Sequence, residues 1–264
     1  MGIIDIHAHA FPDELAQRAV ARLAEEANWK AYLDGRVTSL VESMDKADID
    51  VSVVCPIATR PEHTAGILEW CKQIRSERIE PFPSVHPLTP DAAGWVARVA
   101  DEGFVGIKLH PMYQDFQVDQ EPALGIFRAA SQAGLAVTLH CGRDVAWPET
   151  DDRAAPSRVR NALQAVPKLK LVATHMGGWR MWEQSRQMLV GQNCLLETSF
   201  SLHEMPPAQI VDMIRLHGAD KVLFGTDSPW ADQQAEILAL RSLGLTEEEL
   251  AKIFFSNAAR LLGY

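Results

Sequence analysis

Short apolar runs recur along the whole chain, and between them apolar residues return every three or four positions. The short runs are rich in valine, isoleucine and leucine and hardly alternate with polar residues. This is typical of strands that are buried on both faces of a parallel sheet. They predict strands at Gly2–Ile6, Val51–Cys55, Phe82–Val85, Val105–Leu109, Ala136–Leu139, Leu169–Thr174, Leu195–Thr198 and Val222–Thr226.

The segments between these runs predict amphipathic helices. Most of these helices begin with a proline, whose missing N–H costs nothing in the first turn. A final helix is expected to open at Thr246, because Thr246 and Glu249 have the spacing of a capping box. The connection over residues 10–50 is long enough for two helices. The other helices are predicted at Pro61–Glu77, Pro90–Asp101, Pro122–Ala133, Pro156–Ala165 and Pro206–His217.

Strands and helices that alternate over nearly the whole chain predict an α/β fold. Eight such units over 264 residues have the size and rhythm of a (β/α)8 TIM barrel, which would form a single domain over residues 1–264. A doubly wound sheet is the alternative, but no glycine-rich phosphate loop follows the first strand.

The composition of the chain indicates which classes of binding partner are to be expected. The formal net charge of −10 disfavours nucleic acids and anionic membranes, and no apolar run approaches the roughly 20 residues that span a bilayer. The first residues lack a secretory signal pattern, and the four widely spaced cysteines fit reduced thiols rather than a disulfide framework. We therefore expect a cytoplasmic protein whose partner is a small molecule.

Histidines gather at the carboxyl ends of the predicted strands. His7 and His9 follow the first strand in the order His-Ala-His, so their side chains point the same way. In a parallel barrel these strand ends converge on one rim, where nitrogen and carboxylate donors suit zinc, manganese or iron(II). Asp5 shares the parity of His7 and could orient an imidazole or close the barrel floor. The other residues that follow predicted strands are His86, His110, His140, His175 and Asp227.

Several segments together resemble the amidohydrolase superfamily and, more narrowly, its amidohydrolase-2 branch, which includes aminocarboxymuconate-semialdehyde and resorcylate-type decarboxylases. They are Asp-Ile-His-Ala-His at residues 5–9, Thr-Leu-His at 138–140, Ala-Thr-His-Met-Gly-Gly at 173–178 and Phe-Gly-Thr-Asp at 224–227. The stretch Ser256–Leu261 is similar to the closing helix of that branch. The resemblance runs from residue 3 to residue 262. It implies a TIM barrel of the metallo-dependent hydrolase type and, since relatives are often dimers, a homodimer.

The resemblance also implies a metal site. One divalent ion would be bound by His7, His9, His140 and Asp227, with His175 as a catalytic group beside it. Three imidazoles and one carboxylate leave the ion most of its positive charge, so a water bound to it has a pKa of about 7. Asp227 would take a proton from this water, and His175 would polarise a substrate carbonyl. Zinc is the expected ion, with manganese and iron(II) as alternatives.

Lys108, His110 and Arg143 are the candidates for substrate binding. Lys108 shares the parity of His110, so both are expected to face the pocket. Lys108 would pair with a substrate carboxylate, form a structural ion pair (for instance with Asp5), or be carboxylated and bridge two metals as in some superfamily members. Arg143 lies three residues after His140, where a guanidinium could hold a carboxylate through two hydrogen bonds.

The leading functional prediction is a metal-dependent hydrolase of an amide, ester or lactone. The alternative is a lyase, a non-oxidative decarboxylase of a carboxylated aromatic or muconate-like acid. In that reaction His175 or Asp227 would protonate the carbon that loses CO2. A barrel kept only as a binding module is a third hypothesis. A cation aimed at the carboxylate, Arg143 or Lys108, would favour the decarboxylase.

Overall fold

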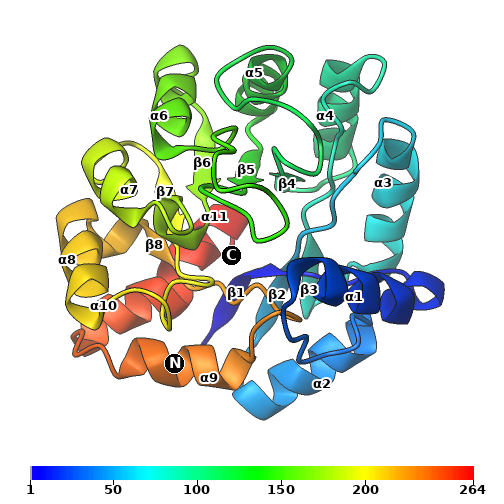
Figure 1. The fold of residues 1–264 in the computed structure, drawn as a ribbon. Coiled ribbons are helices and arrows are strands. Elements are labelled where there is room, and N and C mark those ends of the chain that lie inside the picture. The colour runs from blue at the N-terminus through cyan, green and yellow to red at the C-terminus, as the bar shows by residue number, and fades with distance from the viewer. Residues whose placement is uncertain (1) are drawn as a thin grey trace. The chain divides into compact units, whose positions relative to one another are not determined.

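The computed structural model describes residues 2–264, and parallel strands alternate with helices over this stretch (Figure 1). The residues fall into two compact units. The first unit comprises residues 2–54, 74–80 and 198–264 of the described chain, and the second comprises residues 55–73 and 81–197. That residues 1–264 form a single domain stays a prediction.

In the first unit, β1 lies between β2 and the segment that contains β8. Ile4 and Asp5 of β1 pair in parallel with β2, and the Ile6 N–H donates to the Phe224 carbonyl just after β8. A (β/α)8 fold requires this adjacency of its first and last strands. The strands of this unit are β1 (Ile4–Ala8), β2 (Val51–Val54), β3 (Ile79–Pro81) and β8 (Val222–Leu223).

Helices follow the strands of the first unit as the hydrophobic pattern predicts. Two of them occupy the connection after β1, and a capping box between Thr246 and Glu249 opens α10. These two predictions are confirmed. The helices are α1 (Asp13–Ala27), α2 (Val37–Ala47), α8 (Pro207–His217), α9 (Gln233–Arg241), α10 (Glu247–Ala251), the π-helical turn Lys252–Ser256 and α11 (Asn257–Leu262).

In the second unit, four parallel strands pair in chain order, and each is followed by a helix or turn. Gly106 lies opposite Ala136, which in turn lies opposite Lys170, so the carboxyl ends of β4, β5 and β6 stand side by side. The elements are α3 (His63–Ile74), α4 (Ala92–Asp101), β4 (Gly106–Leu109), α5 (Ala123–Ala133), β5 (Ala136–Leu139), α6 (Pro156–Ala165), β6 (Lys170–Ala173), α7 (Trp182–Met188) and β7 (Leu195–Glu197).

The third strand lies earlier in the chain than predicted. The sequence predicts Phe82–Val85, whereas the regular ladder covers Ile79–Pro81. Pro81 and Pro83 have no N–H to donate, so a continuous ladder cannot extend through them. The predicted segment is nevertheless buried, and the carbonyl of Pro83 accepts from the N–H of Lys108 on β4.

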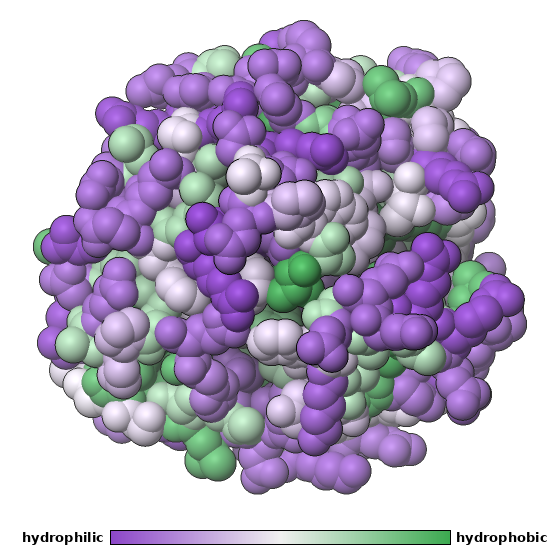
Figure 2. Space-filling model, in the orientation of Figure 1, coloured by the Kyte–Doolittle hydropathy of each residue, from purple (hydrophilic) through white to green (hydrophobic). Residues whose placement is uncertain are grey.

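Buried strands position polar groups as well as apolar ones. All five residues of β1 are buried, including Asp5 and His7. The core of the first unit therefore contains ionisable side chains as well as apolar ones. Hydrophilic side chains prevail on the face shown in Figure 2, where apolar residues are scattered. Among residues 2–264, no helix has the length and apolar character that crossing a membrane demands.

Candidate metal centre

His7, His9 and Asp227 meet at the ends of β1 and β8 in the first unit. Oδ1 of Asp227 lies 2.9 Å from Nε2 of His9 and 3.6 Å from Nε2 of His7. The two imidazole rings are 5.1 Å apart and inclined at 62°. One ligand atom from each residue lies within 4.8 Å of the others. Two nitrogen donors and one carboxylate at this spacing fit one divalent ion such as zinc or manganese.

A tight backbone turn brings Asp227 to the two histidines. The Asp227 N–H donates to the His7 carbonyl over 2.7 Å, and Asp227 has a φ of 64° in the left-handed region. Aspartate tolerates this conformation better than most residues. Strained backbone of this kind is found preferentially at functional sites.

The buried carboxylate of Asp5 stabilises the same turn through hydrogen bonds. Its carboxylate accepts hydrogen bonds from the N–H of His7, the N–H and hydroxyl of Thr226, and the side chain of Gln233. Complete burial raises the pKa of Asp5 to about 7, although these hydrogen bonds act in the opposite direction. Asp5 thus holds the backbone that carries two predicted metal ligands.

Ser199 contacts the other edge of the His7 ring. Its hydroxyl lies 3.2 Å from Nδ1 of His7, which leaves Nε2 on the side of Asp227. A hydrogen bond to one ring nitrogen fixes the ring and favours metal binding at the other. The sequence interpretation missed Ser199, since one serine after a predicted strand carries no specific signal.

In the second unit, three histidine rings from the ends of β4, β5 and β6 contact one another. Nδ1 of His140 lies 3.1 Å from Nε2 of His175, and the two rings are inclined at 65°. The His110 ring stacks on His140 with a centroid distance of 4.1 Å and an angle of 15°. The predicted convergence of these three strand ends is therefore present.

The hydrogen bonds of His140 define where its proton lies. Nε2 of His140 is 2.9 Å from the carbonyl of Arg143, which can only accept, so Nε2 carries the hydrogen. Burial lowers the pKa of His140 well below 6.5, and the charges of His110 and His175 lower it further. Neutral His140 therefore accepts at Nδ1 from Nε2 of His175. Binding of an ion by His140 would replace one of these hydrogen bonds.

His110 and His140 are poorly arranged to share an ion, although both lie near Asp144. The lone pair of an imidazole nitrogen lies in the ring plane, and stacked planes 15° apart do not direct two lone pairs to one point. Asp144 instead pairs with His110, with Oδ2 3.3 Å from Nε2. This arrangement fits the prediction of a substrate-binding role for His110 better than a metal-binding one.

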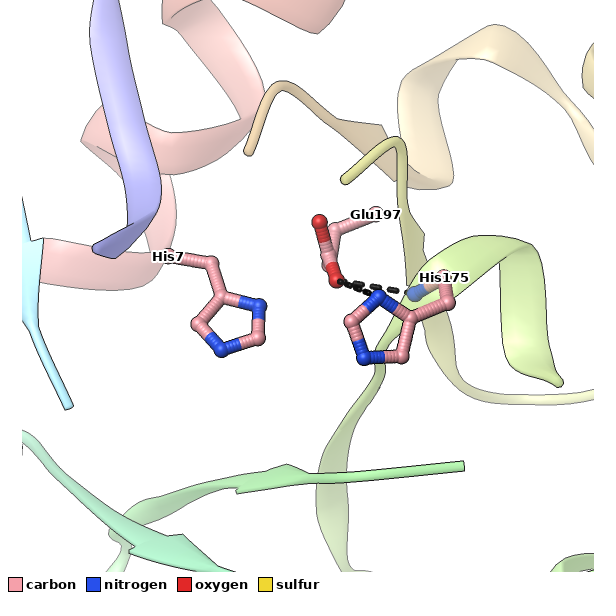
Figure 3. Close-up of side chains that lie close together, drawn as sticks. All are labelled: His7, His175 and Glu197. Carbon is pink, nitrogen blue, oxygen red and sulfur yellow. Dashed lines mark hydrogen bonds and ion pairs between the residues drawn. The ribbon is translucent and has the colours of Figure 1, made fainter. Parts of the chain in front are cut away.

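Glu197 on β7 holds His175. Oε1 of Glu197 accepts from the N–H of His175 over 2.8 Å and lies 3.8 Å from its Nδ1 (Figure 3). Glu197 is fully buried. The sequence interpretation missed this residue, although a glutamate inside the otherwise apolar strand Leu195–Thr198 is a signal that could have found it, because an ionisable group in a buried strand needs a partner.

The two predicted cations differ in their surroundings. Lys108 on β4 is fully buried, and its charge contributes to the lowered pKa of His140. The side chain of Arg143 is 34% exposed and pairs with the exposed Glu149 over 3.3 Å. Nε of Arg143 is buried without a hydrogen-bond partner among the described residues. Arg143 contacts His140 through its backbone carbonyl, and its guanidinium keeps one donor without a partner among the described residues.

The structure thus groups the predicted residues in two sets, one in each unit. The first set is His7, His9 and Asp227, and the second is His110, His140, His175 and Arg143. That His140 binds the same ion as the first set stays a prediction.

Comparison with known proteins defines the family. The amidohydrolase model Amidohydro_2 matches residues 4–264. The chain belongs to this amidohydrolase family. The resemblance inferred from the His-Ala-His, His140, His175 and Asp227 segments is thereby confirmed. A search of curated proteins finds no match.

Solved structures with a similar fold cover the whole length of this amidohydrolase. A dihydroxybenzoic acid decarboxylase from Polaromonas with bound manganese and the inhibitor 2-nitroresorcinol has a TM-score of 0.77 at 17% identity, over 99% of this chain and 97% of its own. A 5-carboxyvanillate decarboxylase from Sphingomonas paucimobilis has a TM-score of 0.73 at 16% identity, over 99% of both chains. An uncharacterized TIM-barrel protein from Bordetella bronchiseptica has a TM-score of 0.78 at 19% identity, over 100% of this chain and 99% of its own. The fold is α/β, of the (β/α)8 type.

These structures correct the functional prediction. The proteins from Polaromonas and Sphingomonas are decarboxylases of aromatic acids, so the hydrolase prediction is wrong and the alternative is favoured. The error has a chemical reason: hydrolysis and decarboxylation use the same histidine and aspartate ligands, so those motifs cannot separate the two reactions. The ion in the Polaromonas structure is manganese, whereas zinc was the expected one.

Proposed function

We propose that this amidohydrolase is a metal-dependent, non-oxidative decarboxylase of small aromatic acids that carry a hydroxyl group near the carboxylate. The fold likeness to two aromatic-acid decarboxylases supports the reaction class. The observation that carries the proposal is the guanidinium of Arg143. It emerges three residues after His140 with a buried Nε that has no partner among the described residues. A carboxylate is the substrate group that a guanidinium binds most strongly, through charge-assisted hydrogen bonds.

The metal would be held by His7, His9 and Asp227, with His140 as the fourth predicted ligand. Manganese is the first candidate ion and zinc the second, because this donor set accepts both. A bound divalent ion would supply positive charge for the hydroxyl and carboxylate oxygens of the substrate. His110, fixed by Asp144, and Lys108 are proposed to complete the substrate pocket, and the roles of both stay to be tested.

The reaction needs one proton and no redox partner. An acid protonates the ring carbon that bears the carboxylate, the bond from that carbon to CO2 then breaks, and its electron pair restores the aromatic ring. His175 and Asp227 are the proposed proton donors. Arg143 would hold the carboxylate out of the ring plane, so that the breaking bond aligns with the ring π system.

The test is a decarboxylation assay with the metal-loaded protein. The panel contains 2,6-dihydroxybenzoate, 5-carboxyvanillate and other hydroxybenzoates, with CO2 release and product formation measured together. In D2O the product should carry deuterium at the carbon that lost CO2. His175→Gln should abolish turnover, while His203→Gln, at an exposed histidine paired with Glu236, serves as the control. No CO2 from any acid of the panel, with manganese and with zinc, would contradict the proposal.

A further inference from the structure

A fully buried carboxylate stands directly behind His175. Glu197 belongs to β7, the strand next to β6, and the same oxygen faces both the backbone N–H and the ring Nδ1 of His175 (Figure 3). The first contact is a hydrogen bond of 2.8 Å, and the second is an electrostatic contact of 3.8 Å. One carboxylate thus acts on the main chain and the side chain of the same histidine.

The backbone at His175 is strained and needs such support. His175 and Met176 have φ values of 58° and 54°, in the left-handed region that residues with a Cβ avoid. Three side chains hold it: Glu197 accepts from the His175 N–H, the Trp182 indole donates to the His175 carbonyl, and the Ser185 hydroxyl donates to the Met176 carbonyl. Strain of this kind persists only where the surroundings over-determine the conformation.

The orientation of the His175 ring follows from both of its edges. Nε2 faces His140 at 3.1 Å and Nδ1 faces the Glu197 carboxylate, so rotation of the ring would break both interactions. The carboxyl group of Glu197 stands on the edge opposite His140. A hydrogen-bonded partner behind a functional histidine fixes its orientation and charge distribution.

We propose that Glu197 is a positioning residue for His175: its carboxylate holds the strained main chain and fixes the ring through which His175 acts on the substrate. The inference deepens the proposed decarboxylase function and rests on it. Two substitutions can test separately the two parts of this role, the oxygen that accepts from the backbone N–H and the carboxylate that faces the ring. Glu197→Gln retains an accepting oxygen and removes the charge, whereas Glu197→Ala removes both.

Two measurements on the metal-loaded protein test this division. For kinetics, Glu197→Gln should lower kcat by about 10- to 100-fold, with KM and bound metal unchanged within about twofold. For the backbone, hydrogen exchange of the 174–178 segment should stay near the wild-type rate in Glu197→Gln and rise about tenfold or more in Glu197→Ala. Glu80→Gln is the matched control, because Glu80 is also a buried strand glutamate but lies on β3 and pairs with Arg75.

The outcomes separate the positioning role from other roles. Wild-type kcat in Glu197→Gln, or equal exchange in Glu197→Ala and wild type, would overturn the proposal. Loss of bound metal in Glu197→Gln would also overturn it, because Glu197 would then be a ligand. If the wild-type protein decarboxylates no acid, the proposed function fails, and hydrogen exchange together with metal content still decides whether Glu197 holds His175.

Discussion

Replacing Asp5 should destabilise the fold and weaken metal binding together. The carboxylate of Asp5 accepts hydrogen bonds of 3.2 Å from the His7 N–H, 3.0 and 2.6 Å from the N–H and hydroxyl of Thr226, and 2.8 Å from Gln233. Asp5→Ala removes all of these acceptors from a fully buried position. The Gln233 side chain then retains only the Ser52 hydroxyl at 3.4 Å, and the Thr226 N–H retains only the His7 carbonyl at 3.3 Å. Three of the four donors belong to, or adjoin, the predicted ligands: the N–H of His7, and the N–H and hydroxyl of Thr226, which precedes Asp227.

The size of the effect follows from this inventory. Hydrogen bonds to a charged group contribute about 1.5–3 kcal/mol each, and a stranded buried donor costs about 1–3 kcal/mol. Burial of the carboxylate, which raises its pKa to about 7, offsets part of that gain. Since losses within one network are not additive, we expect the free energy of unfolding to fall by about 3–5 kcal/mol. Loosening of the turn at Asp227 should lower manganese affinity by about 10- to 100-fold.

Urea unfolding of the metal-loaded protein and titration with manganese measure the two effects. Asp5→Asn, which keeps the side-chain volume, separates loss of hydrogen bonds from creation of a cavity. Asp45→Ala is the control, since Asp45 is exposed and its ion pair with Arg78 should contribute about 0–1 kcal/mol. A loss below about 1 kcal/mol in Asp5→Ala, or unchanged manganese affinity, would refute the supporting role of Asp5.

Four further substitutions test the site and its scaffold. Asp227→Asn should lower both manganese content and CO2 release by at least about 10-fold, measured by metal analysis and product formation. Arg143→Ala should raise KM for an aromatic acid by about 10- to 100-fold, the loss of one charge-assisted pair, while metal content stays constant. Thr246→Ala should lower the free energy of unfolding by about 1 kcal/mol, because it removes the helix cap. Glu249 has its pKa lowered from 4.5 to about 2 by Arg215 and the cap. Its contribution to stability should therefore be complete above about pH 4.5 and disappear toward pH 2, as acid unfolding of Glu249→Gln against wild type would show.

For three of these substitutions a specific result would contradict the prediction. Full activity of Arg143→Ala on every substrate would remove the main support for carboxylate binding at that position. Normal manganese content in Asp227→Asn would exclude this aspartate as a ligand. A parallel acid-unfolding curve for Glu249→Gln and wild type would show that the ion pair with Arg215 contributes nothing to stability.

The hydrophobic pattern predicted most of the strands because buried parallel strands are continuous apolar runs. Ala136–Leu139 has the predicted bounds, and the two helices after β1 follow from the length of that connection. The third strand was displaced because Pro81 and Pro83 cannot donate to a ladder, and a hydrophobicity pattern takes no account of lost donors. The hydrophobic pattern therefore predicted that Phe82–Val85 is buried, but it did not predict which residues of this region pair in the sheet.

The part of the site that follows from strand direction and side-chain alternation was predictable from the sequence. Side-chain alternation and strand polarity placed His7 with His9, and the family resemblance supplied Asp227 as their partner; the structure joins the three within ligand distance. The supporting residues were not accessible in this way. Ser199 and Glu197 act on His7 and His175 through single contacts, and a short-range pattern contains no information on which neighbouring strand supplies them.

The choice between hydrolysis and decarboxylation depends on the residues that were hardest to predict. A hydrolase and a decarboxylase can share His7, His9 and Asp227, because both reactions need positive charge at substrate oxygens. Decarboxylation additionally needs a proton delivered to carbon and a carboxylate held at a fixed angle, so it demands more exact orientation of an acid and a cation. In the proposed reaction those groups would be His175, whose backbone N–H is held by the buried Glu197, and Arg143, whose Nε has no hydrogen-bond partner among the described residues. In the proposed decarboxylase, the choice of reaction would therefore depend on the groups that orient the substrate more than on the residues that would bind the metal.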